Sequence, residues 1–264
     1  MKVAWASDIH LNFVDKAIVN KWLAEFQGAD AIILSGDIAE SKDVIEWLLY
    51  ISEKFSRDIY FVLGNHDFYH SSIDVVRQRV RDLAQMIPNL HYLTTEGVYK
   101  LTDNTALIGH DGWGDAKNGE FLQTPIRIND HRLIADFSGL TRPDLKQKLH
   151  VLGEQAAKHI LAGLNSAKEM ADSLWVVTHV PPFPETCWHN GYAGHKDWIP
   201  DFSCRSVGDM LLRFSKENPS KRLTVFCGHG HSPGEVWMTP NLFVRTARAE
   251  YKRPIVEALM VLPQ

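Results

Sequence analysis

Five short motifs in this chain combine side chains that bind divalent metal ions in proteins. Their carboxylate, imidazole and amide groups occur in the order Asp8-Ile9-His10, Gly36-Asp37, Gly64-Asn65-His66-Asp67, Thr178-His179 and Gly228-His229-Gly230-His231. Each motif directly follows a hydrophobic run with strand character. Oxygen and imidazole ligands suit a first-row divalent ion better than Ca²⁺ or a zinc-thiolate structural site. The motifs therefore predict a two-metal hydrolase site built on the ends of strands.

The elements that must position these motifs alternate between strand and helix. Short apolar runs, several rich in Val and Ile, predict buried strands at 2–6, 31–35, 59–63, 105–108, 174–178 and 223–227, and the tail offers two more at 242–246 and 255–262. Apolar residues three or four positions apart predict helices over 44–55, over 73–83 and over 144–172, the last with glycines at 153 and 163 that could interrupt it. The chain is thus predicted to be an α/β protein that begins βαβαβα.

Strand ends explain how motifs far apart in sequence can act together. In an α/β protein the carboxyl ends of adjacent strands form a crevice, and the side chains just beyond them converge there. Asp8 and His10 are two residues apart, so an extended backbone places both on one side, where they can bind the same ion. The carboxylate of Asp37 could bridge two ions, and the imidazoles of His229 and His231 could reach one ion or two neighbouring ones.

The motif set DxH, GD, GNHD, THxPP and GHxH resembles that of the calcineurin-like metallophosphoesterase superfamily, and it covers nearly the whole chain. The resemblance implies two β-sheets packed face to face and flanked by helices, a four-layer α/β/β/α sandwich. It also implies that one metal ion is bound by Asp8, His10, Asp37 and His231, and the other by Asp37, Asn65, His179 and His229. Asp37 would then be the bridging ligand.

The same resemblance implies a metal-dependent phosphoesterase that hydrolyses a phosphomonoester or phosphodiester. Two ions about 3.5–4 Å apart polarise the phosphate and acidify a bridging water, whose hydroxide attacks phosphorus in line. In the family, the histidine at the position of His66 is the usual candidate for general acid or transition-state stabiliser. Asp67 is expected to orient a neighbouring group rather than bind metal. The ligand set accepts Mn, Fe or Zn, and also Co or Ni.

Composition narrows the domain organisation and the substrate. The chain has 264 residues, of which 45% are hydrophobic and 23% charged, as expected for a single domain over 1–264. Its net charge of −4 does not supply the broad basic surface that duplex nucleic acid needs, so a small phosphate ester is favoured over the alternative of a nuclease. A protein-binding scaffold on the same fold is a further alternative. The long loops 112–143 and 181–204 are expected near the active-site mouth.

Cysteine usage and hydropathy favour a cytoplasmic protein. Three cysteines without CxxC spacing argue against a disulfide framework, and all are expected to be reduced thiols: Cys187, Cys204 and Cys227. No apolar run approaches the ~18 residues of a membrane span, so no membrane partner is expected. The first residues lack the pattern of a signal peptide and already contain candidate ligands. The sequence does not indicate an oligomeric state.

Several residues leave two interpretations open. The stretch Gly109-His110-Asp111-Gly112-Trp113 resembles the ligand motifs, but the family's set is complete without it, so structural packing is favoured over a place in the substrate site. Arg127 and Arg132 could clamp a phosphate or be ordinary surface charges. The aromatic stretch 187–192 could frame the substrate mouth or form an exposed lid. Four tryptophans fall in apolar patterns and are expected in the core: Trp5, Trp22, Trp47 and Trp175.

Overall fold

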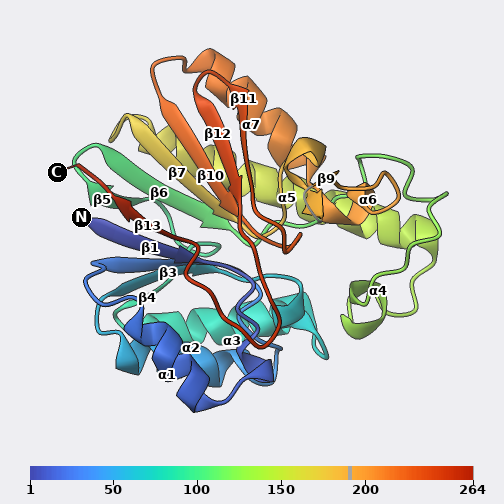
Figure 1. The fold of residues 1–264 in the computed structure, drawn as a ribbon. Helices are drawn as coiled ribbons and strands as arrows, with labels where there is room; N and C mark the ends of the chain where they lie inside the picture. The colour runs from blue at the N-terminus through green and yellow to red at the C-terminus, as the bar shows by residue number, and fades with distance from the viewer. Residues whose placement is uncertain (190–191, 264) are drawn as a thin grey trace.

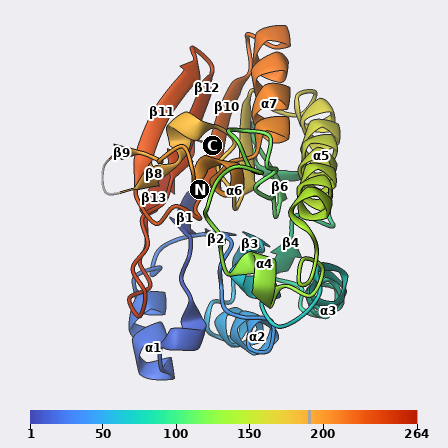
Figure 2. The same ribbon diagram turned by 90° about the vertical axis from the view of Figure 1, so that its right-hand side faces the viewer.

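Two β-sheets pack face to face between two layers of helices in the computed structural model, which describes residues 1–189 and 192–263 (Figures 1 and 2). The first sheet has the strand order β13 (Ala258–Val261), β1 (Lys2–Ala6), β2 (Ala31–Ser35), β3 (Asp58–Val62) and β4 (Leu90–Tyr92). The second has the order β11 (Gly234–Thr239), β12 (Leu242–Thr246), β10 (Arg222–Cys227), β7 (Ser173–Thr178), β6 (Thr105–His110) and β5 (Tyr99–Thr102). The predicted four-layer α/β/β/α arrangement is confirmed.

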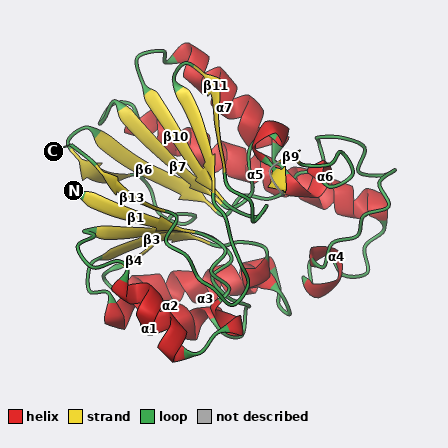
Figure 3. Cartoon of the chain, in the orientation of Figure 1, coloured by secondary structure: helices red, strands yellow, loops and turns green. Residues whose placement is uncertain are grey.

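Parallel pairing brings the strand ends that carry the motifs to one edge of each sheet. In the first sheet β1 pairs in parallel with β2, and β2 with β3. In the second sheet β7 pairs in parallel with β6 and with β10. The arrowheads of these strands converge on the same side of the molecule in Figure 3. Side chains that follow the strands therefore meet where the two sheets come together.

The layer between the sheets is filled by alternate side chains of the facing strands. Trp5 of β1 and Trp175 of β7 both pack edge-on against Phe226 of β10, with ring centroids 5.1 and 5.0 Å apart. Edge-to-face aromatic contacts of this kind add packing energy beyond the area they bury. Trp22 is buried as expected, whereas Trp47 is only partly buried. The two sheets are thus held at a fixed spacing beneath the motifs.

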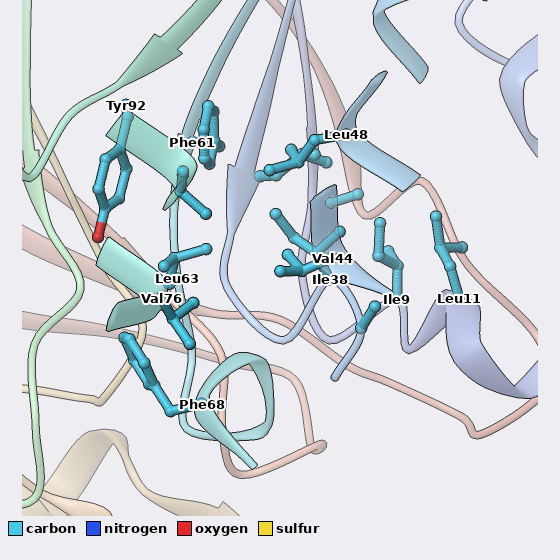
Figure 4. Packing of buried hydrophobic residues seen from close by; sticks show 14 of the residues in the cluster. Ile9, Leu11, Ile38, Val44, Leu48, Phe61, Leu63, Phe68, Val76 and Tyr92 are labelled. Carbon is cyan, nitrogen blue, oxygen red and sulfur yellow. The ribbon is translucent and has the colours of Figure 1, made fainter. Parts of the chain in front are cut away.

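Helices cover the outer face of each sheet. The first sheet is covered by α1 (Lys16–Ala24), α2 (Val44–Lys54) and α3 (Ile73–Met86), and Figure 4 shows Val44 and Leu48 of α2 and Val76 of α3 in the same apolar cluster as Phe61 of β3. The second sheet is covered by α5 (Arg142–Ala167) and α7 (Arg205–Glu217), which pack against each other. In each cluster the buried residues of a helix recur about every three or four positions, so each helix turns one apolar face toward its sheet.

The glycines of α5 do not break it, although the sequence left this open. The helix starts two residues earlier than predicted because Thr141 caps it, and it ends at Ala167 rather than at 172. A Cβ atom at Gly153 would lie 2.4 Å from the Cβ of Asp115, and one at Gly163 would lie 2.4 Å from Cγ2 of Ile108. Both glycines therefore let the helix pass closer to its neighbours than any side chain would permit.

The two predicted loops contain short elements that periodicity cannot reveal. The first holds α4 (Asp130–Leu133), and the second holds a 3₁₀ turn (Pro184–Thr186), β8 (Trp188–His189), β9 (Tyr192–Ala193) and α6 (Ile199–Phe202). Residues 190 and 191 of the aromatic stretch lie outside the described residues. The last strand, β13, is shorter than the predicted 255–262. No helix in the described ranges is both long and apolar enough to cross a membrane.

Candidate metal centre

Four of the predicted ligands form one compact cluster. Each of them offers an atom within 4.8 Å of an atom of every other: Asp8, His10, Asp37 and His231. The Nε2 atoms of His10 and His231 are 3.3 Å apart, and Nε2 of His231 is 3.2 Å from Oδ1 of Asp8. Asp8 and His10 follow β1, Asp37 follows β2, and His231 follows β10. Three strands from two sheets thus place two carboxylates and two imidazoles together.

A second cluster gathers around the amide oxygen of Asn65. This Oδ1 atom lies 3.0 Å from Nε2 of His179 and 2.9 Å from Nδ1 of His229. Nε2 of His179 is also 3.5 Å from Oδ2 of Asp37, which belongs to the first cluster as well. The structure therefore brings all seven predicted ligands into two adjoining groups, and Asp37 is common to both. Nδ1 of His179 faces the backbone carbonyl of Ser35 at 2.9 Å, a contact that sets the plane of the ring.

Five of the seven predicted ligands have left-handed backbone conformations. Positive φ angles between 42° and 66° occur at Asp8, His10, Asp37, His229 and His231. Non-glycine residues rarely adopt this region, and Asp, Asn and His tolerate it better than most. Such strain persists only where the surrounding structure enforces it, and it clusters at functional sites. The extended backbone expected at Asp8 and His10 is therefore wrong, although the two side chains still lie in one cluster.

Three glycines make room for the clusters. A Cβ atom at Gly64 would lie 2.2 Å from Oδ1 of Asp37, and one at Gly228 would lie 2.0 Å from Oδ2 of Asp8. A Cβ atom at Gly36 would lie 2.5 Å from Nδ1 of His179. The glycines of the GD, GNHD and GHxH motifs are therefore required by close packing against the ligand side chains.

Burial keeps two of the imidazoles neutral. It lowers the pKa of His10 to about 4 and the pKa of His229 to about 3. Both rings are thus uncharged at pH 7, and each has a lone pair to donate to a cation. The buried atoms Nδ1 of His10 and Nε2 of His229 have no hydrogen-bond partner among the described residues.

The centre as a whole favours positive charge. Burial alone would lower the pKa of His179, but the carboxylate of Asp37 outweighs it and raises this pKa to about 10. Burial alone would raise the pKa of Asp8, but the charge of His179 and the hydrogen bond from His231 bring it down to about 2. A field that holds a proton on a buried imidazole also attracts a metal ion. Buried carboxylates and facing imidazole nitrogens fit divalent cations well.

The remaining two residues of the GNHD motif take different positions. His66 donates its backbone N–H to Oδ1 of Asp37 at 2.8 Å, and its Nε2 atom is 3.9 Å from Oδ2 of the same carboxylate. Asp67 is fully buried and accepts backbone N–H groups of Ile38, Ala39 and Gly64. Its geometry fits the expected role of fixing the backbone around the ligands.

A cavity of about 530 Å³ opens above both clusters. At its base are residues of the two clusters and His66, and its walls come from both long loops and from Tyr251 near the chain end. Arg127 lines this cavity, whereas Arg132 does not and instead donates to Asn129. Arg127 is the one Lys or Arg among the described residues that line it.

The stretch Gly109-His110-Asp111-Gly112-Trp113, which resembles the ligand motifs, lies outside the cavity. The carboxylate of Asp111 accepts hydrogen bonds from the backbone of Leu63, from Arg77 and from the hydroxyls of Tyr92 and Thr94, at 2.7 to 2.9 Å. Only 1% of this residue is exposed, and it does not line the cavity. The backbone carbonyl of Asp111 accepts a hydrogen bond from the backbone N–H of His179. Asp111 therefore ties strand ends of both sheets together, in line with the favoured structural interpretation.

Sequence reasoning missed three neighbours of the centre. Asp130 accepts a hydrogen bond from the amide of Asn65, the ring of Phe202 lies 4.3 Å from that of His229, and the ring of Tyr251 lies 4.6 Å from that of His10. All three come from segments without regular periodicity. The acidic side chain in Asn129-Asp130-His131 was the one available signal for Asp130, and nothing marked the other two.

Comparison with known proteins gives a consistent result. The family model described as calcineurin-like phosphoesterase matches residues 1–233. No curated protein sequence matches the chain. Among solved structures, a phosphopantetheinyl hydrolase from Mycobacterium tuberculosis is similar at a TM-score of 0.67 and 14% identity, over 96% of this chain and 90% of that one.

Two further structures show the same fold. A dimetal phosphatase from Danio rerio is similar at a TM-score of 0.58 and 14% identity, over 96% of this chain and 88% of that one. A protein of Thermus thermophilus is similar at a TM-score of 0.53 and 14% identity, over 94% of this chain and 88% of that one. At this level of identity the likeness concerns the fold alone.

Proposed function

Because this chain belongs to the calcineurin-like phosphoesterase family and is a metal-dependent hydrolase of phosphoric esters, we propose that it cleaves small phosphomonoesters or phosphodiesters. One divalent ion would be held by Asp8, His10, Asp37 and His231, and the other by Asp37, Asn65, His179 and His229. Mn, Fe and Zn fit this mixture of oxygen and nitrogen ligands, as do Co and Ni. Asp37 would be the shared ligand.

The observation that carries the proposal is the convergence of both clusters on Asp37 at the base of one cavity. Nε2 of His10 and Nε2 of His179 lie 3.8 and 3.5 Å from the same Oδ2 atom of this carboxylate. When bound, two such ions neutralise phosphate charge and make a water nucleophilic at neutral pH. The protein's own contribution is to orient the ligands, and the left-handed turns and close-packed glycines do this.

His66 is the proposed proton donor to the leaving oxygen. Its backbone is fixed to Asp37, and its ring lines the cavity beside the clusters. The ring packs between Tyr69 and His10, with centroids 4.3 and 4.6 Å away. It is thus held in place without being a ligand. General acid catalysis by a positioned imidazole contributes about 10²- to 10⁴-fold to a rate.

The cavity supports a small substrate. Its volume of about 530 Å³ falls within the ~300–1,000 Å³ of typical small-molecule sites. Polynucleotide binding depends on several cationic contacts with phosphates. The single arginine in the described lining and the net charge of −4 therefore favour a small ester over a nucleic acid.

The test is hydrolysis of a generic aryl phosphate and of an aryl phosphodiester by purified protein with added Mn²⁺. Wild-type protein is expected to be active, and His66→Ala to lose about 10²- to 10⁴-fold in kcat while it still binds two ions per chain. His70→Ala is a matched control because His70 is exposed and does not line the cavity. An inactive wild-type protein that binds no metal would instead support a protein-binding scaffold.

A further inference from the structure

A row of aromatic rings leads from the candidate metal centre toward the outside of the cavity. The ring of Phe202 lies 4.3 Å from that of His229, and the ring of Trp198 lies 5.6 Å beyond it. Both line the cavity, and Trp198 is 43% exposed. A tryptophan with so much apolar surface left open beside a site is available to stack on a ligand.

The segment that carries these rings is fastened to the first long loop. The backbone carbonyl of Asp197 accepts a hydrogen bond from Thr124, and that of Pro200 accepts one from Ala116. Nε2 of His131 lies 3.0 Å from Oδ1 of the buried Asp201. The rings are thus held before any substrate enters, which lowers the entropic cost of binding.

Resting on the proposed function, we infer that the alcohol part of the substrate carries a planar ring that stacks on Trp198. The cavity lining also contains the apolar side chains of Ile128 and Ile199 and the thiol of Cys187. The single lining arginine offers little to a polyanionic leaving group. Stacking of a base on an aromatic side chain changes affinity by about 5- to 150-fold.

Two esters with the same scissile bond isolate the ring. Adenosine 5′-monophosphate and ribose 5-phosphate share a primary alcohol as leaving group and differ in the planar base. The metal-loaded enzyme is expected to favour the nucleotide by at least about 5-fold in kcat/KM. Trp198→Ala should bring the ratio close to one. Trp237→Ala should keep it, because Trp237 is 59% exposed on β11 and does not line the cavity.

Equal kcat/KM for the two esters, or a preference that survives Trp198→Ala, would overturn the inference. Dissociation constants of both compounds, measured by calorimetry on metal-loaded protein, give a second readout that needs no turnover. Preferential binding of the nucleotide without hydrolysis of any ester would refute the proposed function and keep the ring-binding inference. Hydrolysis of aryl phosphates together with equal binding of both compounds would refute the inference that a planar ring stacks on Trp198. The proposed phosphoesterase function would then still stand.

An independent observation concerns the amide of Asn65. Its oxygen faces His179 and His229, and its nitrogen donates to Oδ1 of Asp130 at 2.9 Å. An amide that rotated by half a turn would present N–H groups to the metal site instead of a lone pair. Asp130 is 4% exposed and also accepts the hydroxyl of Tyr69 at 2.8 Å. A carboxylate in this place accepts a hydrogen bond from the amide nitrogen and not from the oxygen.

The geometry points to Asp130 as a positioning residue that holds the amide oxygen of Asn65 toward the second ion. In Asp130→Asn the new amide can donate to a rotated Asn65, so the orientation is no longer enforced. Partners that orient metal ligands are typically worth about 10- to 100-fold in metal affinity. Calorimetric titration with Mn²⁺ is expected to show this loss for one of two ions. Asp136→Asn is the control, because this acid of the same loop contacts Ile73 and Lys148 instead.

A double-mutant cycle separates orientation from general damage. In an Asn65→Asp background there is no amide to orient, and Asp130 faces a second carboxylate. The loss of Mn²⁺ affinity caused by Asp130→Asn should therefore be much smaller there than in the wild type. Unchanged affinity in Asp130→Asn, or equal losses in both backgrounds, would overturn the assignment. Thermal melts of all variants show whether each is folded.

Discussion

Replacing Asp111 is expected to destabilise the fold rather than to remove the catalytic chemistry. Its carboxylate accepts four hydrogen bonds, one of them from Nε of Arg77 at 2.9 Å. The Arg77 and Asp111 side chains are 16% and 1% exposed. Removing one partner of a buried ion pair leaves an uncompensated charge and costs about 3–5 kcal/mol. The free energy of unfolding of a whole domain is about 5–15 kcal/mol. Asp111→Ala should therefore lose a large part of this free energy.

Urea unfolding followed by circular dichroism measures this effect. With a slope of about 3 kcal/mol per M, the midpoint should fall by about 1–2 M. Asp111→Asn should lose less, because it retains a hydrogen-bond acceptor while it removes the charge. The double variant Arg77→Met with Asp111→Asn should be more stable than the sum of the single losses predicts, since neither charge is then left alone.

The opposite pattern would contradict this structural role. If Asp111→Ala kept the wild-type midpoint and its two metal ions but lost activity, the residue would belong to the substrate site. A loss below about 1 kcal/mol would mean that water or neighbouring groups compensate for the buried guanidinium. Either result would refute the reasoning from burial and pairing.

The remaining predictions concern the metal centre, the cavity and the thiols. Gly64→Ala should abolish binding of both Mn²⁺ ions in calorimetry, because its Cβ would lie 2.2 Å from Asp37, whereas Gly97→Ala, with nothing within 4 Å, should bind normally. Arg127→Ala should raise the KM for an aryl phosphate several-fold, and Arg132→Ala should not, as steady-state kinetics would show. Burial raises the pKa of all three thiols, those of Cys187, Cys204 and Cys227. At pH 8 they should therefore stay protonated and react with Ellman's reagent only when the protein unfolds. Fast reaction of the folded protein would contradict this.

The sequence predicted the strands that precede the ligand motifs to within one residue, because an apolar run is a local signal, whereas β4, β5, β11, α1 and α7 were not predicted. Each motif directly follows a run of apolar residues, and parallel pairing then brings the ends together. The left-handed backbone of Asp8 and His10 could not be foreseen, since the surrounding packing enforces it. The glycines of α5 suggested breaks because glycine disfavours helix. Their packing role was hidden because their close neighbours Asp115 and Ile108 are distant in sequence.

Contacts that depend on irregular segments were beyond sequence reasoning. Asp130 meets Asn65 across 65 positions of the chain, and no period or motif links them. Trp198 and Phe202 belong to the loop that was expected to shape the substrate mouth, but which of its aromatic residues line the cavity depends on how the two loops fasten to each other. Residues 190 and 191 of that loop lie outside the described ranges.

The most direct test of the proposed centre is an anomalous difference map from crystals grown with Mn²⁺. Two peaks about 3.5–4 Å apart are predicted. One should be ligated by Asp8, His10, Asp37 and His231, and the other by Asp37, Asn65, His179 and His229. A single peak, or peaks whose ligands do not share Asp37, would contradict a two-metal site bridged by this carboxylate.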